Sequence, residues 1–185
     1  MNAPTDAELL DATARGDRAA YGTLVRRHHA SILRYARAIA GDAAEDVVQQ
    51  AFLDGLRGAA TYRGGAAVRT WLFTLTRNAA YRSRRLRVGE PRTHVPLDAV
   101  AEQAGWGADP ETALAQQLDA ARLRAALATL SPDAQEILVL RDMEGIPGAE
   151  TAVLLKLSLP AMKSRLHRAR LELAAAVRKE FGYGS

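Results

Sequence analysis

Apolar residues recur at helical spacing along most of the chain, and this pattern predicts helices rather than strands. The segment after Asp17 carries its apolar and aromatic residues on one face and stops at Gly41, which is typical of a capped helix. A second helix is expected over 43–57. The segment TYRGGAA then interrupts the periodicity, and a third helix is expected from about Ala67.

Two local signals mark further helix starts. Asp42 and Glu45 have the spacing of a capping box ahead of the second helix. Ser131 followed by Pro132 combines an N-cap residue with proline at the first helical position, and the helix that they begin is expected to end at Gly145. Helices are therefore expected in both halves of the chain.

A segment without clear periodicity separates these halves. Residues 88–112 contain three glycines and three prolines, which is typical of a linker. The fold class expected for the 185 residues is therefore all-α. We expect two small helical domains, 1–87 and 113–185, joined by a flexible linker over 88–112.

The C-terminal domain contains the pattern of a helix-turn-helix. A short helix over 148–156 is followed by a break at 157–159 and by a long basic helix from Pro160. One face of the long helix is apolar, and the other suits the major groove of duplex DNA. Lys163, Ser164, His167 and Arg168 are expected on this second face, with Arg165 and Arg170 at its edges, and Arg165 is counted with the first four as a candidate DNA contact. The alternative is an amphipathic helix whose basic face is only solvated.

The third helix of the N-terminal domain is unusually basic. Residues 63–85 contain six arginines and no acid. Phe73 is expected between Arg69 and Arg77 on the face opposite the apolar one, where arginines can neutralise phosphates and a ring can stack on an unpaired base. The alternative is a solvated face with one stray phenylalanine. Asn78, expected on the apolar face, could satisfy backbone groups or line a pocket that reads a base edge.

Composition narrows the class of function. The chain has no cysteine, which excludes disulfides and cysteine-based metal sites or nucleophiles. Its four histidines lack the spacing of a helical zinc site, and no catalytic motif stands out, so we expect no active site, cofactor or metal. The acidic N-terminus is unlike a signal peptide and no apolar run would span a membrane, which predicts a cytoplasmic protein. Arginines in blocks suggest an anionic partner.

Five stretches, in this order, resemble the bacterial extracytoplasmic-function (ECF, group 4) sigma factors of RNA polymerase, within the sigma-70 family. They are GDRAAYGTLVRRHH (16–29), GDAAEDVVQQAFL (41–53), YRGGAAVRTWLFTLTRN (62–78), LSPDAQEILVLRDMEGI (130–146) and KSRLHRAR (163–170). The set covers nearly the whole chain apart from the linker and the extreme ends. The resemblance implies a protein without enzymatic activity that binds core RNA polymerase, directs it to promoters and helps to open the DNA.

The resemblance also implies roles for single residues. The second helix would dock on the clamp helices of the largest polymerase subunit through Asp46, Gln49, Gln50 and Leu53. The residues implied at the minus-ten promoter element, where the strands are melted, are Thr61, Tyr62, Arg63, Trp71, Phe73, Leu75, Arg77 and Asn78. A pocket for a flipped base would be lined by Thr61, Tyr62, Leu75 and Asn78. The long basic helix would read the minus-thirty-five element. The polymerase flap and an anti-sigma factor are further implied partners.

The helix-turn-helix departs from the family pattern in its turn and first helix. Lys156 and Pro160 stand where the family usually or often has glycine. Pro147 and Gly148 replace a serine-like cap and an aromatic residue, and Thr151 replaces isoleucine. Lys156 is expected to strain the turn if that position needs a positive φ, which bears on the strength of minus-thirty-five binding.

Two other classes of protein remain open from the sequence. An ordinary helix-turn-helix repressor or activator would use the C-terminal helix and leave the arginine-rich helix unexplained. A small enzyme with an accessory DNA-binding domain would need catalytic residues that no motif reveals. Binding to core polymerase separates the first alternative from a sigma factor, and turnover without residues 113–185 would support the second.

Overall fold

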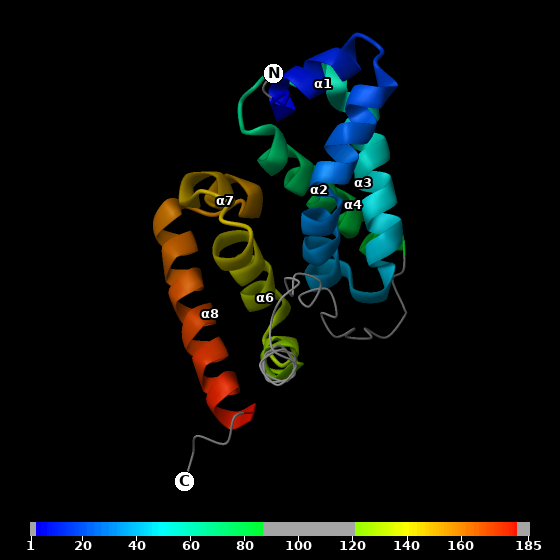
Figure 1. The fold of residues 1–185 in the computed structure, drawn as a ribbon. Helices are drawn as coiled ribbons and strands as arrows, with labels where there is room; N and C mark the ends of the chain where they lie inside the picture. The colour runs from blue at the N-terminus through cyan, green and yellow to red at the C-terminus, as the bar shows by residue number, and fades with distance from the viewer. Residues whose placement is uncertain (1–2, 87–120, 181–185) are drawn as a thin grey trace.

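The computed structural model describes residues 3–86 and 121–180, in which helices occur and strands do not. The elements of the N-terminal domain are α1 (Asp6–Ala14), α2 (Arg18–Ala40), α3 (Ala44–Gly58) and α4 (Val68–Leu86). In the C-terminal domain, residues 121–128 are helical and are followed by α6 (Pro132–Leu138), α7 (Gly148–Leu155) and α8 (Leu159–Glu180) (Figure 1). The all-α prediction is confirmed. The predicted linker, 88–112, lies outside the described residues.

The long helix α2 has the bounds that the sequence predicts. The side chain of Asp17 accepts hydrogen bonds from the backbone N–H groups of Ala19 and Ala20 at 2.8 and 3.0 Å. Gly41 ends the helix with a φ of 58°, a conformation that glycine adopts without steric cost. Local capping chemistry therefore sets both ends of α2.

Helix α1 is an element that the sequence reading missed, although its start carries a recognisable signal. Thr5 and Glu8 form a complete capping box, in which each side chain accepts a hydrogen bond from the other residue's backbone N–H. Asp6 then joins α1 to α2, since its carboxylate lies 2.5 Å from Arg27 Nη1 and 2.7 Å from His28 Nε2.

The capping box predicted from Asp42 and Glu45 is wrong. A 3₁₀ turn over Gly41–Ala43 leads straight into α3, and the N-cap residue is Ala43, with no side-chain cap. An N-cap normally has extended backbone, whereas Ala43 has a φ of −81° and a ψ of 6°. The 3₁₀ turn leaves no extended residue directly before α3, so α3 begins without a side-chain cap.

Helices α2, α3 and α4 pack on one another and form the core of the N-terminal domain. Tyr21 of α2 reaches across to α3, where its hydroxyl donates to the carbonyl of Phe52. Burial raises the pKa of Tyr21 to about 12. This crossing requires glycine at position 55, because a Cβ there would lie 2.5 Å from the Tyr21 hydroxyl.

In the C-terminal domain, Ser131 caps α6 as predicted, by accepting from the Ala134 N–H. The helix then widens into a π-helical turn, Val139–Met143, and Gly145 ends it with a φ of 64°. Ion pairs hold α8 beside this segment, since Arg170 binds both carboxylate oxygens of Asp142, at 2.6 and 3.0 Å.

The turn between α7 and α8 has the conformation that makes Lys156 unfavourable. Lys156 caps α7 with a φ of 57° and a ψ of 43°, in the left-handed region, and among the described residues it is the one non-glycine residue with positive φ. The positive φ on which the expected strain depends is therefore present. Pro160 is accommodated, because it is the second residue of α8, where a helix does not need its N–H.

We expect Lys156→Gly to raise the free energy of unfolding by about 1 kcal/mol, because glycine removes the Cβ clash of the left-handed conformation. Lys156→Ala is the matched control, since it removes the charge but keeps the Cβ. Chemical denaturation followed by circular dichroism measures both. Equal stability of the glycine and alanine variants would show that the backbone conformation carries no penalty here.

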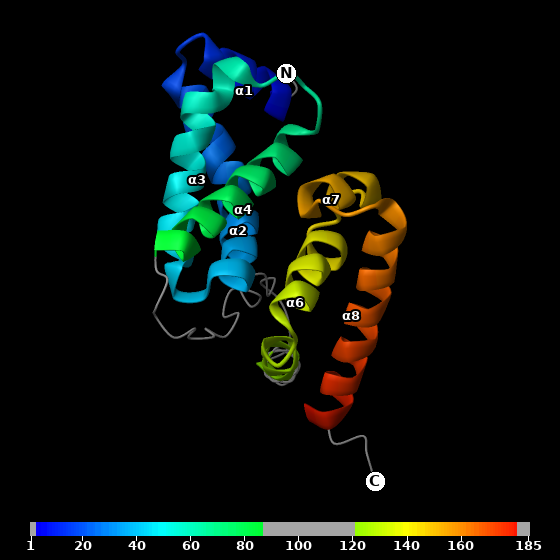
Figure 2. The ribbon, with the colours of Figure 1, turned by 180° about the vertical axis from the view of Figure 1, so that it is seen from behind.

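The two domains lie against each other through α2 and α4 on one side and α6, α7 and the π-helical turn on the other. Figure 2 shows α6 and α7 facing the N-terminal helices, with α8 on the far side of α6. The buried apolar residues of both domains form one continuous cluster. The outer face of α8 is thus directed away from the N-terminal domain.

Candidate nucleic-acid interface

The outer face of α8 carries an exposed group of polar and basic side chains. Four of the five residues predicted to contact duplex DNA lie there: Lys163, Ser164, His167 and Arg168. The opposite face is buried against the domain through Met162, Leu166 and Ala169. Within residues 3–86 and 121–180, neither Lys163 nor Arg168 pairs with a carboxylate. Their charges are therefore available to an anionic ligand.

Arg165, the fifth predicted residue, is placed elsewhere. Its guanidinium donates to the carbonyl of Asp133 at 3.0 and 3.2 Å and lies 2.9 Å from that residue's carboxylate. Glu136 is a further 3.7 Å partner. Arg165 therefore fastens α8 to the start of α6 and does not share the outer face with Lys163.

On α4, the face expected to be exposed is covered by the C-terminal domain. Phe73 is 0% exposed; the Tyr35 ring meets it edge-on with the ring centroids 5.2 Å apart, and the Arg69 guanidinium lies 5.5 Å from its centroid. The prediction that Phe73 lies on the side away from the core is wrong in this arrangement. The spacing of Arg69, Phe73 and Arg77 does place them on one face, as predicted, but Glu144 and Glu136 of the C-terminal domain contact the two arginines there.

Two glutamates of the C-terminal domain meet these arginines, and the sequence reading did not single them out. Glu136 accepts from Arg77 Nε and from the Tyr35 hydroxyl, each at 2.9 Å. Glu144 accepts from Arg34 Nε at 2.6 Å and from Arg69. Glu136 and Glu144 are only 5% and 4% exposed. Glu136 directly precedes the apolar run Ile137–Leu140, and an acid beside such a run could have signalled a buried ion pair.

The titration of neighbouring groups reflects this buried charge. Burial, and after it the charge of Glu136, raises the pKa of the Tyr35 hydroxyl well above its ordinary value. Burial alone lowers the pKa of Arg77, but the charge of Glu136 and its hydrogen bond outweigh that effect and leave the pKa raised. Tyr35 therefore remains a hydrogen-bond donor and Arg77 a cation at every ordinary pH.

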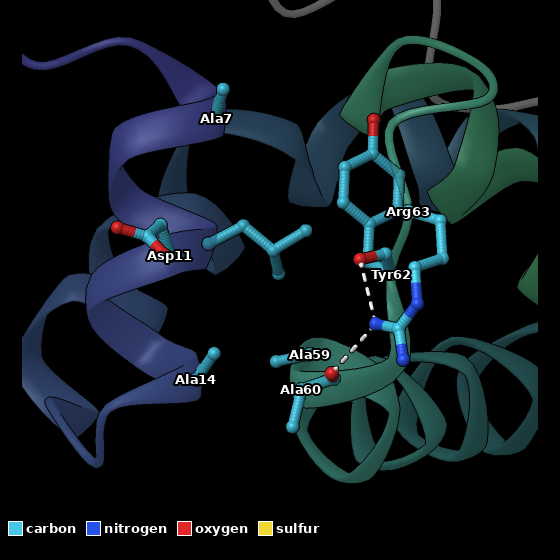
Figure 3. Close-up of a pocket in the computed structure, with 8 residues that line it drawn as sticks. Ala7, Asp11, Ala14, Ala59, Ala60, Tyr62 and Arg63 are labelled. Carbon is cyan, nitrogen blue, oxygen red and sulfur yellow. Dashed lines mark hydrogen bonds between the residues drawn. The ribbon is translucent and has the colours of Figure 1, made fainter.

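The loop between α3 and α4 borders a hollow of about 390 Å³. Tyr62 and Arg63 line one side of it and α1 lines the other, with Asp11 among its residues (Figure 3). Arg63 donates to the carbonyls of Ala60 and Tyr62 at 3.1 and 3.4 Å. This volume is at the small end of the range for ligand sites.

Tyr62 stiffens this loop in two ways. Its ring packs on Trp71, with centroids 5.3 Å apart, and its hydroxyl donates to the carbonyl of Ala66. Burial and, second, the charge of Glu150 on α7 raise the pKa of Tyr62. The loop is thereby held against the first turn of α4.

The four residues predicted to line a base pocket do not all border this hollow. Thr61, Leu75 and Asn78 are absent from its lining. Asn78 is exposed, so its placement on the buried face was wrong. It lies seven residues after Trp71, or about 10 Å along the helix, with nearly the same orientation around the axis. A pocket that contains both Tyr62 and Asn78 stays a prediction.

Helix α3 presents a mixed apolar and polar strip to the outside. Asp46, Gln49 and Leu53 are exposed along it, and Leu53 retains 39% of its surface. Gln50 is partly covered and donates to Asp54 at 2.7 Å. Leu56 is also exposed, so that two leucines interrupt the polar surface. Exposed leucines flanked by amides and acids suit a protein partner.

Throughout the part of the chain that the structure describes, no helix is long and apolar enough to cross a membrane.

Comparisons with known proteins match both halves of the chain. The Sigma-70 region 2 family matches residues 24–88, and the Sigma-70, region 4 family matches residues 120–173. The ECF RNA polymerase sigma factor SigM of Mycobacterium tuberculosis is 38% identical over 172 residues, which cover 92% of this chain and 83% of SigM. The RNA polymerase sigma factor CnrH of Cupriavidus metallidurans is 31% identical over 181 residues, or 93% of this chain and 95% of CnrH.

Solved structures show the same fold. CnrH in complex with the cytosolic domain of CnrY has a TM-score of 0.66 and 27% identity, covering 94% of this chain and 97% of that chain. The sigma factor RpoE of Bartonella quintana in complex with the anti-sigma factor NepR has a TM-score of 0.65 at 22% identity, over 85% and 94% of the two chains. From the matched regions and the identity to SigM and CnrH, this chain belongs to the ECF sigma factors of bacterial RNA polymerase.

Proposed function

We propose that this sigma factor divides its work between three surfaces: α3 for core polymerase, α8 for duplex promoter DNA, and α4 with its preceding loop for the opened strand. The observation that carries the proposal is the outer face of α8, where Lys163, Ser164, His167 and Arg168 are exposed while the opposite face is packed. A helix with these two faces can enter a major groove without unfolding its own domain.

Direct readout of the minus-thirty-five element is the proposed task of α8. Lys163 and Arg168 would bind guanine edges or phosphates, and Ser164 can bond to either. The position of Arg165 against Asp133 argues for a different task, which is to fix the orientation of α8 on its domain.

We expect the double variant Lys163→Ala/Arg168→Ala to weaken binding to duplex promoter DNA. Its dependence of log K on log salt should also flatten, by about one unit for each phosphate that the variant no longer neutralises. The matched control is Arg178→Ala/Lys179→Ala, which removes two exposed charges from the last turn of α8. A salt slope that falls equally in both variants would mean that only net charge, and no defined phosphate contact, was removed.

Melting of the minus-ten element is the proposed task of α4 and the loop before it. Arg63, Arg69 and Arg77 would neutralise phosphates of the opened strand, while Tyr62, Trp71 and Phe73 offer aromatic surfaces for unstacked bases. The hollow beside Tyr62 supports binding of one extruded base. In the arrangement described here, Arg69 and Arg77 are paired with Glu144 and Glu136, so freeing them for this task requires the domains to separate.

Core polymerase is the proposed partner of the strip on α3, with the clamp helices of its largest subunit as the docking site and the flap as the contact of the C-terminal domain. An anti-sigma protein is the proposed regulator. Two related structures support this. RpoE is in complex with the anti-sigma factor NepR, and CnrH is in complex with the cytosolic domain of CnrY. A factor that works on polymerase would act in the cytoplasm.

In vitro transcription with purified core polymerase tests the proposed function. Core enzyme with the full chain should initiate at defined sites in a library of promoter fragments, and core enzyme alone should not. Sequence-specific binding to duplex DNA by a chain that never associates with core polymerase would instead support an ordinary helix-turn-helix regulator.

A further inference from the structure

Two carboxylates of the C-terminal domain are buried among basic and hydroxyl groups of the N-terminal domain. Each one contacts α4 and α2 together: Glu136 binds Arg77 and Tyr35, and Glu144 binds Arg69 and Arg34. The backbone carbonyl of Glu144 also accepts from Arg69, at 2.5 Å. We refer to Glu136, Glu144 and these four partners as the interdomain cluster.

The π-helical turn gives both glutamates the same direction. Eight residues separate Glu136 from Glu144, which would place them about 80° apart around a regular α-helix. Between them, however, Val139–Met143 forms a wider π turn, closed by the 2.8 Å bond from the Glu144 N–H to the Val139 carbonyl. This turn rotates Glu144 back toward the face of Glu136. Such turns occur frequently at functional sites.

The partners on α4 have a spacing that suits a strand of nucleic acid. Arg69 and Arg77 lie about two helical turns apart, each about 40° around the helix from Phe73, which lies between them. Two cations flanking an aromatic ring are the groups that bind phosphates and a stacked base of a single strand. In the structure, carboxylates of the C-terminal domain occupy both cations, whereas the Phe73 ring packs against Tyr35 of its own domain.

A purely structural interface would be expected to use other residues. Burying an ion pair costs desolvation energy that its attraction barely offsets, and apolar residues of similar size often stabilise as well or better. The ion pairs therefore contribute little net stability, but the contact between the two domains depends on the arginines remaining paired with the glutamates. A competing polyanion satisfies the same arginines, which makes the contact reversible.

We propose that the C-terminal domain competes within the chain with single-stranded DNA for α4, with Glu136 and Glu144 taking the places of two phosphates on Arg77 and Arg69. The inference rests on the proposed role of α4 in binding the opened strand. The closed form still exposes Leu53 on α3 and Lys163 on α8. Polymerase and duplex DNA can therefore be engaged first, and the strand-binding face is released afterwards.

The first test measures binding of a short fluorescein-labelled single-stranded oligonucleotide to the full chain by anisotropy. Apparent affinity scales with the fraction of open molecules, so Glu136→Gln/Glu144→Gln should bind on the order of tenfold more tightly than the unaltered chain. Loss of two acids favours DNA binding in any case. Glu172→Gln/Glu180→Gln, at two exposed positions of α8, makes the same change in net charge and should show a much smaller gain.

For a second variant, the proposal predicts a change in oligonucleotide affinity opposite to the change expected from net charge alone. Arg34→Gln removes a cation, which ordinarily weakens DNA binding, but it also removes a partner of Glu144 and should therefore strengthen binding of the oligonucleotide. Arg26→Gln is the matched control on the same helix, where Arg26 donates to Thr23. Arg34→Gln leaves both glutamates in place, and so remains informative if the double glutamine variant unfolds.

Small-angle scattering on the same samples separates the possible outcomes. A larger radius of gyration together with tighter binding supports the proposal. If Arg34→Gln loses as much affinity for the oligonucleotide as Arg26→Gln does, the proposal is overturned. It is also overturned if the domains separate and binding still requires Arg77, but the affinity for the oligonucleotide does not increase. If the opened chain binds equally well after Arg69→Ala/Arg77→Ala, then the proposed role of α4 itself is wrong.

Discussion

Leu53→Asp on α3 is expected to abolish stable recruitment of core RNA polymerase. Leu53 and Leu56 are exposed side by side on α3, and a partly exposed leucine surrounded by polar side chains is the kind of residue that a partner buries completely. Placing a carboxylate at the centre of such an interface costs about 2–4 kcal/mol, which weakens binding by roughly 30- to 1000-fold.

Pull-down and titration with purified core polymerase measure this loss. Leu171→Asp on α8 is the matched control, because Leu171 is also exposed and the substitution is the same. Circular dichroism of both variants should match the unaltered chain, since neither leucine belongs to the core. Full polymerase binding by Leu53→Asp would move the docking site away from α3.

Tyr62→Ala/Asn78→Ala is expected to reduce promoter opening by roughly 10- to 100-fold while polymerase binding is retained. Tyr62 supports the loop through Trp71 and Ala66, and it lines the hollow proposed for an extruded base. Asn78 is exposed on α4, about two helical turns after Trp71, where an amide can reach a base edge. Weaker binding of the extruded bases disfavours strand separation, because it offsets less of the unstacking energy.

Permanganate reactivity of promoter thymines reports the opened strand directly. Tyr62→Phe separates the contribution of the ring from that of the hydroxyl, since it keeps the ring but loses the hydrogen bond to the Ala66 carbonyl. Unchanged reactivity in the double variant, measured at saturating polymerase, would exclude this loop and this part of α4 from melting.

The helices themselves could largely be predicted from local sequence. Asp17 and Ser131 cap the helices that they were expected to cap, and Gly41 ends α2, because capping bonds span only a few residues. The exceptions are local too: Thr5 and Glu8 begin a helix that was overlooked, and Asp42 fails as a cap because a 3₁₀ turn leads straight into α3.

The candidate site was predicted less evenly. The outer face of α8 follows from helical periodicity, since one face must pack and the other remains outside. The same reasoning failed on α4, where Phe73 sits on the face opposite the apolar stripe and yet is fully buried. Periodicity shows which residues share a face of a helix. It does not show how many of those faces are covered by other helices.

By itself, the sequence determined the helical class, most helix ends, the strained turn at Lys156 and the basic outer face of α8, because each depends on interactions within one or two helical turns. Only the tertiary structure decided which arginines are paired. Glu144 and Arg34 are 110 residues apart, and Glu136 and Arg77 are 59 apart. The free energy of such pairs depends on how one domain is placed against the other and on the exclusion of water between them, and neither is encoded in any local pattern.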